Sequence, residues 1–202
     1  MNQMHWENVY RTKSPAETSW YRPHLELSFQ WIIEAAPDRS TPILDVGAGE
    51  STLVDDLLGA GYRDVTALDI SEAALARLQV RLNAAASQVC WLVGDITQTA
   101  LPSGFGVWHD RAVFHFLVEP ERRAVYVRQL LRCVRPGGHV ILAIFGLQGP
   151  QKCSGLPTAR YDAESLACEL GPHFQLQRST LMEHQTASGA TQQFLYCDFI
   201  RR

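Results

Sequence analysis

Short apolar runs alternate with helix-type segments through the middle of the chain, and this alternation limits the possible folds more than any other feature. Buried-strand patterns occupy residues 42–46, 64–69, 89–93, 105–109 and 139–145. Amphipathic patterns predict helices over 50–59, 71–83 and 120–134, with Ser71 as an N-cap and Pro120 at the start of the last one. Strands that alternate with helices pair in parallel through right-handed crossovers. The sequence therefore predicts an α/β fold with a mainly parallel, doubly wound sheet.

The two ends of the chain depart from this alternation. Residues 1–21 are rich in aromatic side chains and predict an irregular segment, which a helix over 23–36 follows. Residues 146–160 form a connection rich in Gly and Pro that is too long for an idle linker. A helix near 162–170 comes next, and strand-like runs over 174–183 and 192–200 can pair as an antiparallel hairpin at the sheet edge. We expect one domain over residues 1–202, in which 1–21 and 146–160 cover the substrate.

Charge and composition exclude several classes of protein. With 202 residues, a net charge of −3 and a pI near 6.1, the chain does not suit nucleic-acid phosphates or an anionic membrane. No apolar run reaches the roughly 18 residues of a membrane span, and the first residues lack the order of a signal peptide. Five cysteines without a CxxC pair indicate reduced thiols, no metal site and a cytoplasmic protein. The arginines along the 120–134 helix and its end are interpreted as a solvated face: Arg122, Arg123, Arg128, Arg132 and Arg135.

A glycine-rich turn joins the first predicted strand to its helix. Gly47 and Gly49 lie in this turn, where glycines let a ligand approach the backbone closely. Asp69 stands 20 positions after Gly49, at the end of the next strand, where a carboxylate can accept hydrogen bonds from a ribose diol. Asp95 follows the third strand in the same way. The pattern indicates a nucleotide-like ligand at the carboxyl ends of the strands.

Two interpretations of the ligand at this turn are possible, a dinucleotide or S-adenosylmethionine. A dinucleotide site uses G-x-G-x-x-G, and Thr52 stands at the third glycine position. Asp45, two residues before the first glycine, makes little sense beside a pyrophosphate. A carboxylate at that position suits a ligand that carries an ammonium and a sulfonium group. The residues therefore favour S-adenosylmethionine over NAD.

Four ordered motifs, DVGAGES, ALDIS, VGDI and RPGG, resemble those of the class I S-adenosylmethionine-dependent methyltransferases over residues 42–145. The resemblance implies a Rossmann-like seven-stranded sheet of order 3-2-1-4-5-7-6, mostly parallel with an antiparallel C-terminal strand. It also implies a site for S-adenosyl-L-methionine and its product S-adenosyl-L-homocysteine. In that site Asp45, Gly47 and Gly49 would surround the methionine part, Asp69 would hold the ribose, Asp95 would bond the adenine amino group, and Ile70 and Ile96 would lie against the adenine.

The N-terminal segment is similar to a narrower branch, the translation-elongation-factor lysine methyltransferases. Trp6 and Tyr10 match the W-x-x-x-Y pair of that branch, and Trp20 matches a tryptophan before its first helix. In that branch the aromatic segment covers the cofactor. The resemblance thus implies that Trp6, Tyr10 and Trp20 belong to the cofactor site. We expect the 1–21 segment to be a mobile cap that orders when the cofactor binds.

The fourth strand and the residues after it supply the candidates for the acceptor side. His109, Asp110, Arg111 and His115 form the densest polar group near the expected pocket mouth. His109 or His115 could act as a general base, or Arg111 and a histidine could steady an anionic acceptor such as a thiolate. Structural roles stay open, with Asp110 and Arg111 as an ion pair and His115 packed in a helix. Arg111 stands where the lysine methyltransferase branch has a lysine, and the AVFHFL run that follows departs from that branch.

Four functions follow from these residues. The leading one is methyl transfer to a small-molecule acceptor, including a thiol or another soft nucleophile. The second is methylation of protein lysines. A cofactor-binding partner without catalysis and an NAD-linked reductase are the other two, and the intact acids and Thr52 argue against them. The oligomeric state and the role of the Cys153 loop are not encoded in any pattern.

Overall fold

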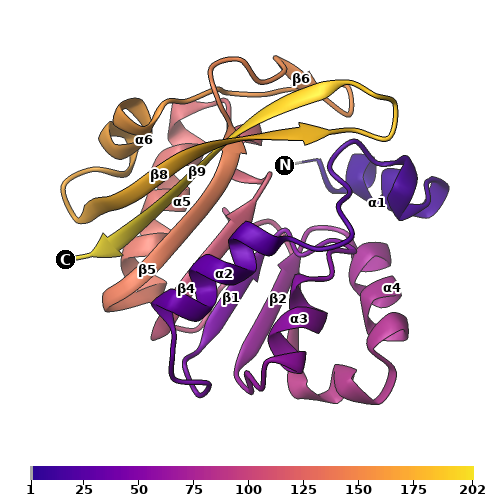
Figure 1. Ribbon diagram of the computed structural model, residues 1–202, viewed down its shortest axis with the longest axis horizontal. Coiled ribbons are helices and arrows are strands. Elements are labelled where there is room, and N and C mark those ends of the chain that lie inside the picture. Colours follow the sequence, from indigo (N-terminus) through magenta and orange to yellow (C-terminus); the bar gives the residue numbers. More distant parts are fainter. Residues whose placement is uncertain (1) are drawn as a thin grey trace.

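A seven-stranded sheet forms the centre of the protein, in the order β3-β2-β1-β4-β5-β9-β8 (Figure 1). We describe it from a computed structural model that covers residues 2–202, so Met1 of the predicted cap lies outside the described residues. Strands β1 to β5 pair in parallel, and β9 runs antiparallel to both β5 and β8. The predicted α/β class, the strand order and the antiparallel C-terminal strand are confirmed.

The strands of this sheet lie close to their predicted positions. Their bounds are β1 Ile43–Val46, β2 Val65–Asp69, β3 Val89–Val93, β4 Phe105–Arg111, β5 Val134–Phe145, β8 Phe174–Gln185 and β9 Thr191–Arg201. Two short strands, β6 Lys152–Cys153 and β7 Leu156–Pro157, form a separate hairpin inside the predicted 146–160 connection. That connection is therefore partly ordered by its own backbone pairing.

Helices cover both faces of the sheet (Figure 1). The α-helices are α1 Gln3–Thr12, α2 Glu26–Ala35, α3 Leu53–Gly59, α4 Glu72–Leu82, α5 Pro120–Cys133 and α6 Ala163–Leu170, and the 3₁₀ turns are η1 Pro15–Glu17, η2 Asn83–Gln88 and η3 Phe114–Phe116. Helices α2, α3 and α4 pack on one face, and α5 and α6 pack on the other. No helix within residues 2–202 combines the length and the apolar character needed to cross a membrane.

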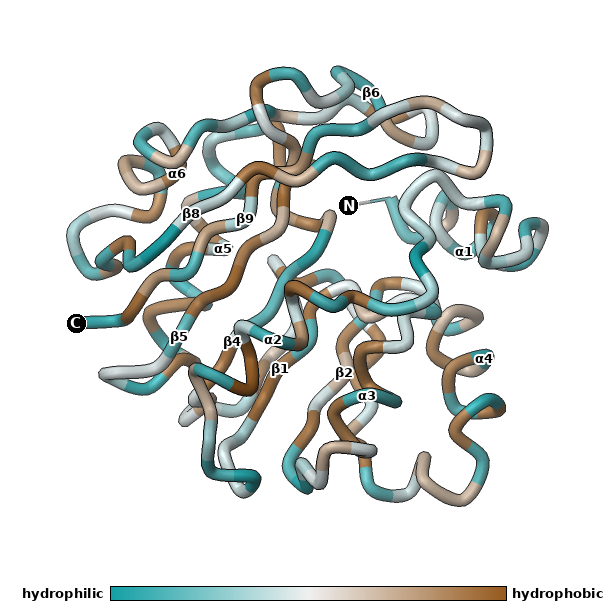
Figure 2. The backbone as a smooth tube through the Cα atoms, in the orientation of Figure 1, coloured by the Kyte–Doolittle hydropathy of each residue, from teal (hydrophilic) through white to brown (hydrophobic). Residues whose placement is uncertain are grey.

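The core has two layers because successive strand residues point to opposite faces. Ile43 of β1 packs in the cluster beneath α2 and α3, and Leu44 packs in the cluster beneath α5. Both side chains are fully buried, which accounts for the continuous apolar run from which a covered strand was predicted. Figure 2 shows hydrophobic residues along most of β5, the strand on which the parallel and antiparallel parts of the sheet meet.

The prediction of an irregular segment over 1–21 is wrong, because most of it is helical. Helix α1 is capped by Asn2, whose side chain accepts the His5 backbone N–H at 3.1 Å. Trp6, Val9 and Tyr10 share the buried face of α1 at helical spacing. They pack on α4, so contact with the rest of the fold supplies the stability that a polar segment of this length lacks by itself.

Strand β5 begins at Val134, five residues before the predicted start. The RPGG run, expected to be a turn, lies inside the strand, which pairs with β4 through a register shift between Phe105 and Val107. A Cβ atom at Gly138 would lie 3.1 Å from the carbonyl oxygen of Phe105. Together with Val134 Cγ1 at 2.8 Å and the Arg135 carbonyl oxygen at 2.9 Å, both in β5 itself, this contact leaves no room for a side chain at Gly138.

Candidate functional site

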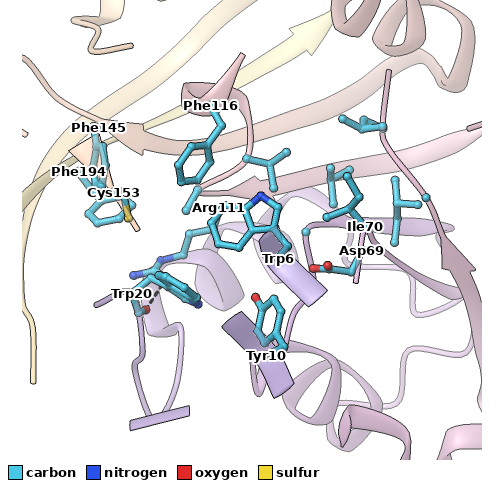
Figure 3. Close-up of a pocket in the computed structure, with 17 residues that line it drawn as sticks. Trp6, Tyr10, Trp20, Asp69, Ile70, Arg111, Phe116, Phe145, Cys153 and Phe194 are labelled. Atoms are coloured by element: carbon cyan, nitrogen blue, oxygen red, sulfur yellow. Dashed lines mark hydrogen bonds between the residues drawn. The ribbon is translucent and has the colours of Figure 1, made fainter. Parts of the chain in front are cut away.

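A cavity lies between α1 and the carboxyl ends of β1, β2 and β4. Open parallel sheets bind ligands at this place, where the connections after neighbouring strands leave toward opposite faces. In Figure 3, Asp69 and Ile70 lie at one end of the cavity, Phe145, Phe194 and Cys153 lie at the other, and Trp6 stands between them. The cavity has a polar end next to the glycine turn and an aromatic end next to β5 and β9.

The glycine turn closes around Asp69. The Asp69 carboxylate accepts the Gly49 backbone N–H at 2.9 Å and the Ser71 backbone N–H at 2.8 Å. Burial raises the pKa of Asp69 to about 6, against the effect of these two hydrogen bonds. Gly47 and Gly49 have φ angles of 69° and 54°, and an added Cβ at Gly49 would lie 2.5 Å from the Tyr10 hydroxyl. Only glycine at these two positions keeps this turn open to a ligand.

Asp45 lies in an adjoining hollow, which shares Tyr10 and Trp20 with the main cavity. One carboxylate oxygen, Oδ1, contacts His109 Nδ1 at 2.7 Å, and Oδ2 is buried with no hydrogen-bond partner among the described residues. A buried carboxylate oxygen without a partner is costly unless a ligand supplies a donor. The hollow therefore suits a ligand with a cationic or N–H group.

His109 lines the same hollow, but it is not an open side chain at the pocket mouth. His109 is 1% exposed, and its second ring nitrogen, Nε2, contacts Ser28 Oγ of α2 at 2.9 Å. Because both ring nitrogens contact protein groups, neither nitrogen faces an acceptor in this arrangement. The prediction failed because the contact depends on a serine that is 81 positions away in the chain.

Ile70 and Ile96 line the cavity next to Asp69, where the resemblance places the adenine. Asp95 lies beside this wall, and its carboxylate accepts a hydrogen bond from Arg122 Nη2 of α5 at 2.6 Å. The interpretation of Arg122 as part of a solvated face is therefore wrong. Arg122 holds Asp95 in place and adds a positive charge close to the adenine end.

Three predicted aromatic residues, Trp6, Tyr10 and Trp20, all line the cavity. The rings of Trp6 and Phe116 lie 5.0 Å apart in an edge-to-face arrangement, and Trp6 and Trp20 lie 5.7 Å apart. Glu7 of the same helix accepts hydrogen bonds from the Ser71 hydroxyl at 2.7 Å and from the Ala73 backbone at 3.2 Å. Helix α1 is thus fastened to the start of α4, directly after Asp69.

We expect Trp6→Ala to weaken the binding of S-adenosylhomocysteine about threefold to tenfold, because the Trp6 ring lines the cavity and a lost aromatic contact contributes about 0.5–1.5 kcal/mol. Isothermal calorimetry measures this change directly. The matched control is Met4→Ala on the same helix, since Met4 is 81% exposed. If the wild type and Trp6→Ala bind S-adenosylhomocysteine with equal affinity, the 1–21 segment does not contribute to the cofactor site.

The segment between α1 and α2 is clamped to the sheet by its backbone. His184 Nε2 donates to the Ser19 carbonyl at 2.8 Å, and Arg111 Nη1 donates to the Trp20 carbonyl at 2.9 Å. The Ser19 hydroxyl also lies 3.6 Å from Cys153 Sγ, in the hairpin of the 146–160 connection. The N-terminal segment and the 146–160 connection therefore meet beside the aromatic end of the cavity, which Trp20 and Cys153 both line.

Arg111 is the one charged side chain that lines the aromatic end, among the residues that the structure describes. Its guanidinium lies 4.8 Å from the centre of the Phe194 ring, and its Nε is buried without a partner among those residues. The predicted ion pair with Asp110 is not formed. Asp110 is buried and accepts a hydrogen bond from Tyr126 at 2.6 Å instead. Arg111 thus keeps a donor and a positive charge for a ligand.

His115 also lies away from the predicted pocket mouth. Its ring is fully buried, stacks on Phe145 with 4.1 Å between ring centres, and accepts the Phe145 backbone N–H at Nδ1 (3.2 Å). Burial and the positive charge of Arg111 lower the pKa of His115 to about 3. A histidine with this pKa is too weak a base for an acceptor at neutral pH, and the packed alternative describes it correctly.

Sequence reasoning missed several residues of the site. Phe116, Phe145, Phe194 and Cys153 form the aromatic end, and Glu7, Ser28 and Arg122 hold site residues in place. The position of Glu7 next to Trp6 does not indicate that its carboxylate contacts Ser71, which lies 64 positions further along the chain. The aromatic residues lie in apolar strands, where the same pattern predicts core.

The polar end fits the chemistry of S-adenosylmethionine. The unpartnered oxygen of Asp45 can receive the ammonium group, and Asp69 can receive the ribose hydroxyls. Apolar side chains of Ile70 and Ile96 offer a wall for the adenine. These are the positions at which the resemblance placed the same groups.

Comparison with known proteins agrees with this fit. A methyltransferase-domain family matches residues 43–138. The eEF1A lysine and N-terminal methyltransferase homolog of Drosophila melanogaster is 33% identical over 146 residues, which are 68% of this chain and 21% of that protein. The chain thus spans about a fifth of the length of this relative. The predicted similarity to elongation-factor lysine methyltransferases is confirmed.

Solved structures share the fold. The N-methyltransferase NodS from Bradyrhizobium japonicum, in complex with S-adenosyl-L-homocysteine, has a TM-score of 0.75 and 14% identity, with 100% of this chain and 99% of that chain covered. A structure from work on the conversion of a disulfide bond into a thioacetal group during echinomycin biosynthesis has a TM-score of 0.77 and 20% identity, with 97% and 90% covered. Because the family match spans the glycine turn, Asp69 and Asp95, around which the cavity is built, the chain belongs to the class I S-adenosylmethionine-dependent methyltransferases.

Proposed function

We propose that this protein transfers a methyl group from S-adenosylmethionine to a small-molecule acceptor, a thiol or another soft nucleophile, bound at the aromatic end of the cavity. One observation carries the choice of acceptor. Arg111 is the charged side chain at that end, and no carboxylate lines it among residues 2–202. A cation without a carboxylate favours an acceptor that reacts as an anion.

At the polar end, the chain binds and orients the cofactor. Bound S-adenosylmethionine supplies a methyl group on a positively charged sulfur. Asp45 receives the ammonium group, Asp69 holds the ribose diol, and α1 covers the site through Trp6 and Tyr10. Fixing the donor in one orientation is the main contribution that a protein can make to an in-line displacement, because alignment alone contributes up to about 7–11 kcal/mol in favourable systems.

At the aromatic end, Arg111 lowers the free energy of an anionic nucleophile. A thiol has a pKa of about 8.5, and a neighbouring positive charge moves that pKa toward neutrality without a general base. An amine would have to lose its proton first, and His115 cannot accept it because its pKa is about 3. The Phe194 ring, which could hold an ammonium group, already faces the guanidinium of Arg111.

Protein-lysine methylation is the second candidate, favoured by one specific observation. The relative from Drosophila melanogaster is named as a lysine and N-terminal methyltransferase, and its similarity covers 68% of this chain. The matching aromatic residues Trp6, Tyr10 and Trp20 lie at the cofactor cavity, however, and they select no acceptor. The charge of Arg111 would repel a lysine ammonium, so we rank this candidate second.

A matched pair of acceptors separates the two candidates. Benzyl mercaptan, benzylamine and a lysine peptide are each incubated with the enzyme and S-adenosylmethionine, and methylated products are identified by mass spectrometry. We expect methylation of the thiol and no product from the amine or the peptide. Methylation of the peptide alone would establish the second candidate and contradict the first.

Arg111→Ala should shift the rising limb of the pH–rate profile with the thiol upward by about one unit, because the thiolate loses its positive neighbour. The shift is measured from kcat/KM between about pH 6 and 10, the range that spans the ordinary pKa of a thiol. Arg128→Ala is the control, since Arg128 is an exposed arginine on α5 away from the cavity. An unchanged limb in Arg111→Ala would exclude Arg111 from stabilising the acceptor.

A further inference from the structure

Three side chains from three different elements form a buried chain of hydrogen bonds beneath the glycine turn. Asp45 of β1 and His109 of β4 are directly paired in the register of these parallel strands. His109 Nδ1 lies 2.7 Å from Asp45 Oδ1, and His109 Nε2 lies 2.9 Å from Ser28 Oγ on α2. Ser28, Asp45 and His109 are exposed by 0%, 3% and 1% respectively. The contacts are therefore shielded from water.

We propose that His109 is a positioning residue for cofactor binding, which holds the Asp45 carboxylate so that Oδ2 faces the amino-acid part of the cofactor. A carboxylate on a short side chain can rotate and present either oxygen. The contact with His109 occupies Oδ1, so Oδ2 is the oxygen that stays without a partner among the described residues. Both Asp45 and His109 line the hollow beside the main cavity, at the end of the glycine turn where the amino-acid part would lie.

The partners of His109 determine which ring nitrogen carries the hydrogen. In the neutral ring, one nitrogen carries a hydrogen and the other accepts one. The Asp45 carboxylate can only accept, so Nδ1 carries the hydrogen and donates to Asp45, and Nε2 accepts from the Ser28 hydroxyl. This arrangement leaves Oδ2 of Asp45, which has no partner among the described residues, to accept from an ammonium group. Helix α2 thereby helps to set which oxygen of Asp45 is presented to the ligand.

A purely structural role for this network predicts a different outcome. If the contacts only joined α2 to the sheet, their loss would weaken the fold and would affect every ligand of the cavity alike. If they orient Asp45, the loss would affect only ligands that carry the amino-acid part. S-adenosylhomocysteine and 5′-methylthioadenosine make this comparison possible, because both contain the adenosyl group and only the first contains the amino acid.

The experiment measures the Kd of both ligands by calorimetry for the wild type, His109→Leu, His109→Asn and Ser28→Ala. We expect His109→Leu to weaken S-adenosylhomocysteine about tenfold, the loss typical of a hydrogen bond to a charged group, and to leave 5′-methylthioadenosine within about twofold. Asparagine offers a donor near the place of Nδ1, so His109→Asn should recover most of the affinity. Ser28→Ala should lower the selectivity for S-adenosylhomocysteine by a smaller factor.

Equal loss for both ligands, or no loss for S-adenosylhomocysteine, would overturn the proposal. If His109→Leu does not fold, the comparison between Ser28→Ala and His109→Asn decides, since an unchanged ratio of the two Kd values in Ser28→Ala would also overturn it. The measurement uses no methyl acceptor. Its result is therefore independent of the acceptor assigned to the aromatic end.

Discussion

Acidification from pH 7 to about pH 3 is expected to remove about 4–5 kcal/mol of stability through His115 alone. The pKa of this buried ring is about 3 in the folded protein, and an exposed histidine in the unfolded chain has a pKa of about 6.5. Below pH 6.5 His115 is therefore protonated in the unfolded chain and still neutral in the folded protein. The free energy of unfolding falls with pH until the pH reaches about 3. One pKa unit corresponds to about 1.4 kcal/mol, which sets the size of the loss.

Urea unfolding between pH 7 and pH 4 measures the first part of this loss, about 3 kcal/mol, with His115→Asn as the variant without a titrating ring. The asparagine oxygen can accept the Phe145 N–H that His115 Nδ1 accepts. We expect the variant to be less stable than the wild type at pH 7 and to approach it as the pH falls. Parallel curves for the two proteins would show that His115 is not the buried neutral group described above.

The second large effect is expected at Asp69, where Asp69→Ala should weaken S-adenosylhomocysteine about tenfold to hundredfold. The substitution removes a charge-assisted hydrogen bond to the ribose, which contributes about 1.5–3 kcal/mol. It also leaves the Gly49 and Ser71 backbone N–H groups without the acceptor that holds the glycine turn closed. Calorimetry measures the affinity, and thermal unfolding shows whether the fold survives.

Asp64→Ala is the matched control, because Asp64 is an exposed aspartate directly before β2. Its removal changes the net charge by the same amount as the removal of Asp69. An affinity in Asp69→Ala equal to that of the control would place the ribose elsewhere in the cavity.

The parallel part of the sheet was predictable because strands and helices alternate through the middle of the chain, and the full strand order followed from the resemblance to the methyltransferase family. Ile43 and Leu44 show why β1 was recognisable: these adjacent residues enter opposite core layers, so both must be apolar. The segment over 1–21 was not predictable in the same way. Its helix depends on Trp6 and Tyr10 reaching α4, a contact between distant parts of the chain that no local pattern encodes.

The polar end of the site was predictable because its residues lie in one turn and at the ends of successive strands. Gly47, Gly49 and Asp69 keep this relation in any parallel sheet of this order. The surroundings of His109 and Arg122 depend instead on how α2 and α5 cross the sheet. The sequence reveals that these side chains can form hydrogen bonds, and only the packed helices decide with which partner.

The place of β9 in the sheet has a consequence for synthesis. This strand is inserted between β5 and β8, although it follows both in the chain. While the ribosome is still adding residues 191–201, β5 has an open backbone edge whose final partners, Phe194 to Ile200, are missing. Residues 140–145 of that edge are apolar and buried in the finished protein, and an open apolar edge strand readily pairs with another chain. A nascent chain therefore already contains the polar half of the cavity while the apolar edge of β5 is still unpaired.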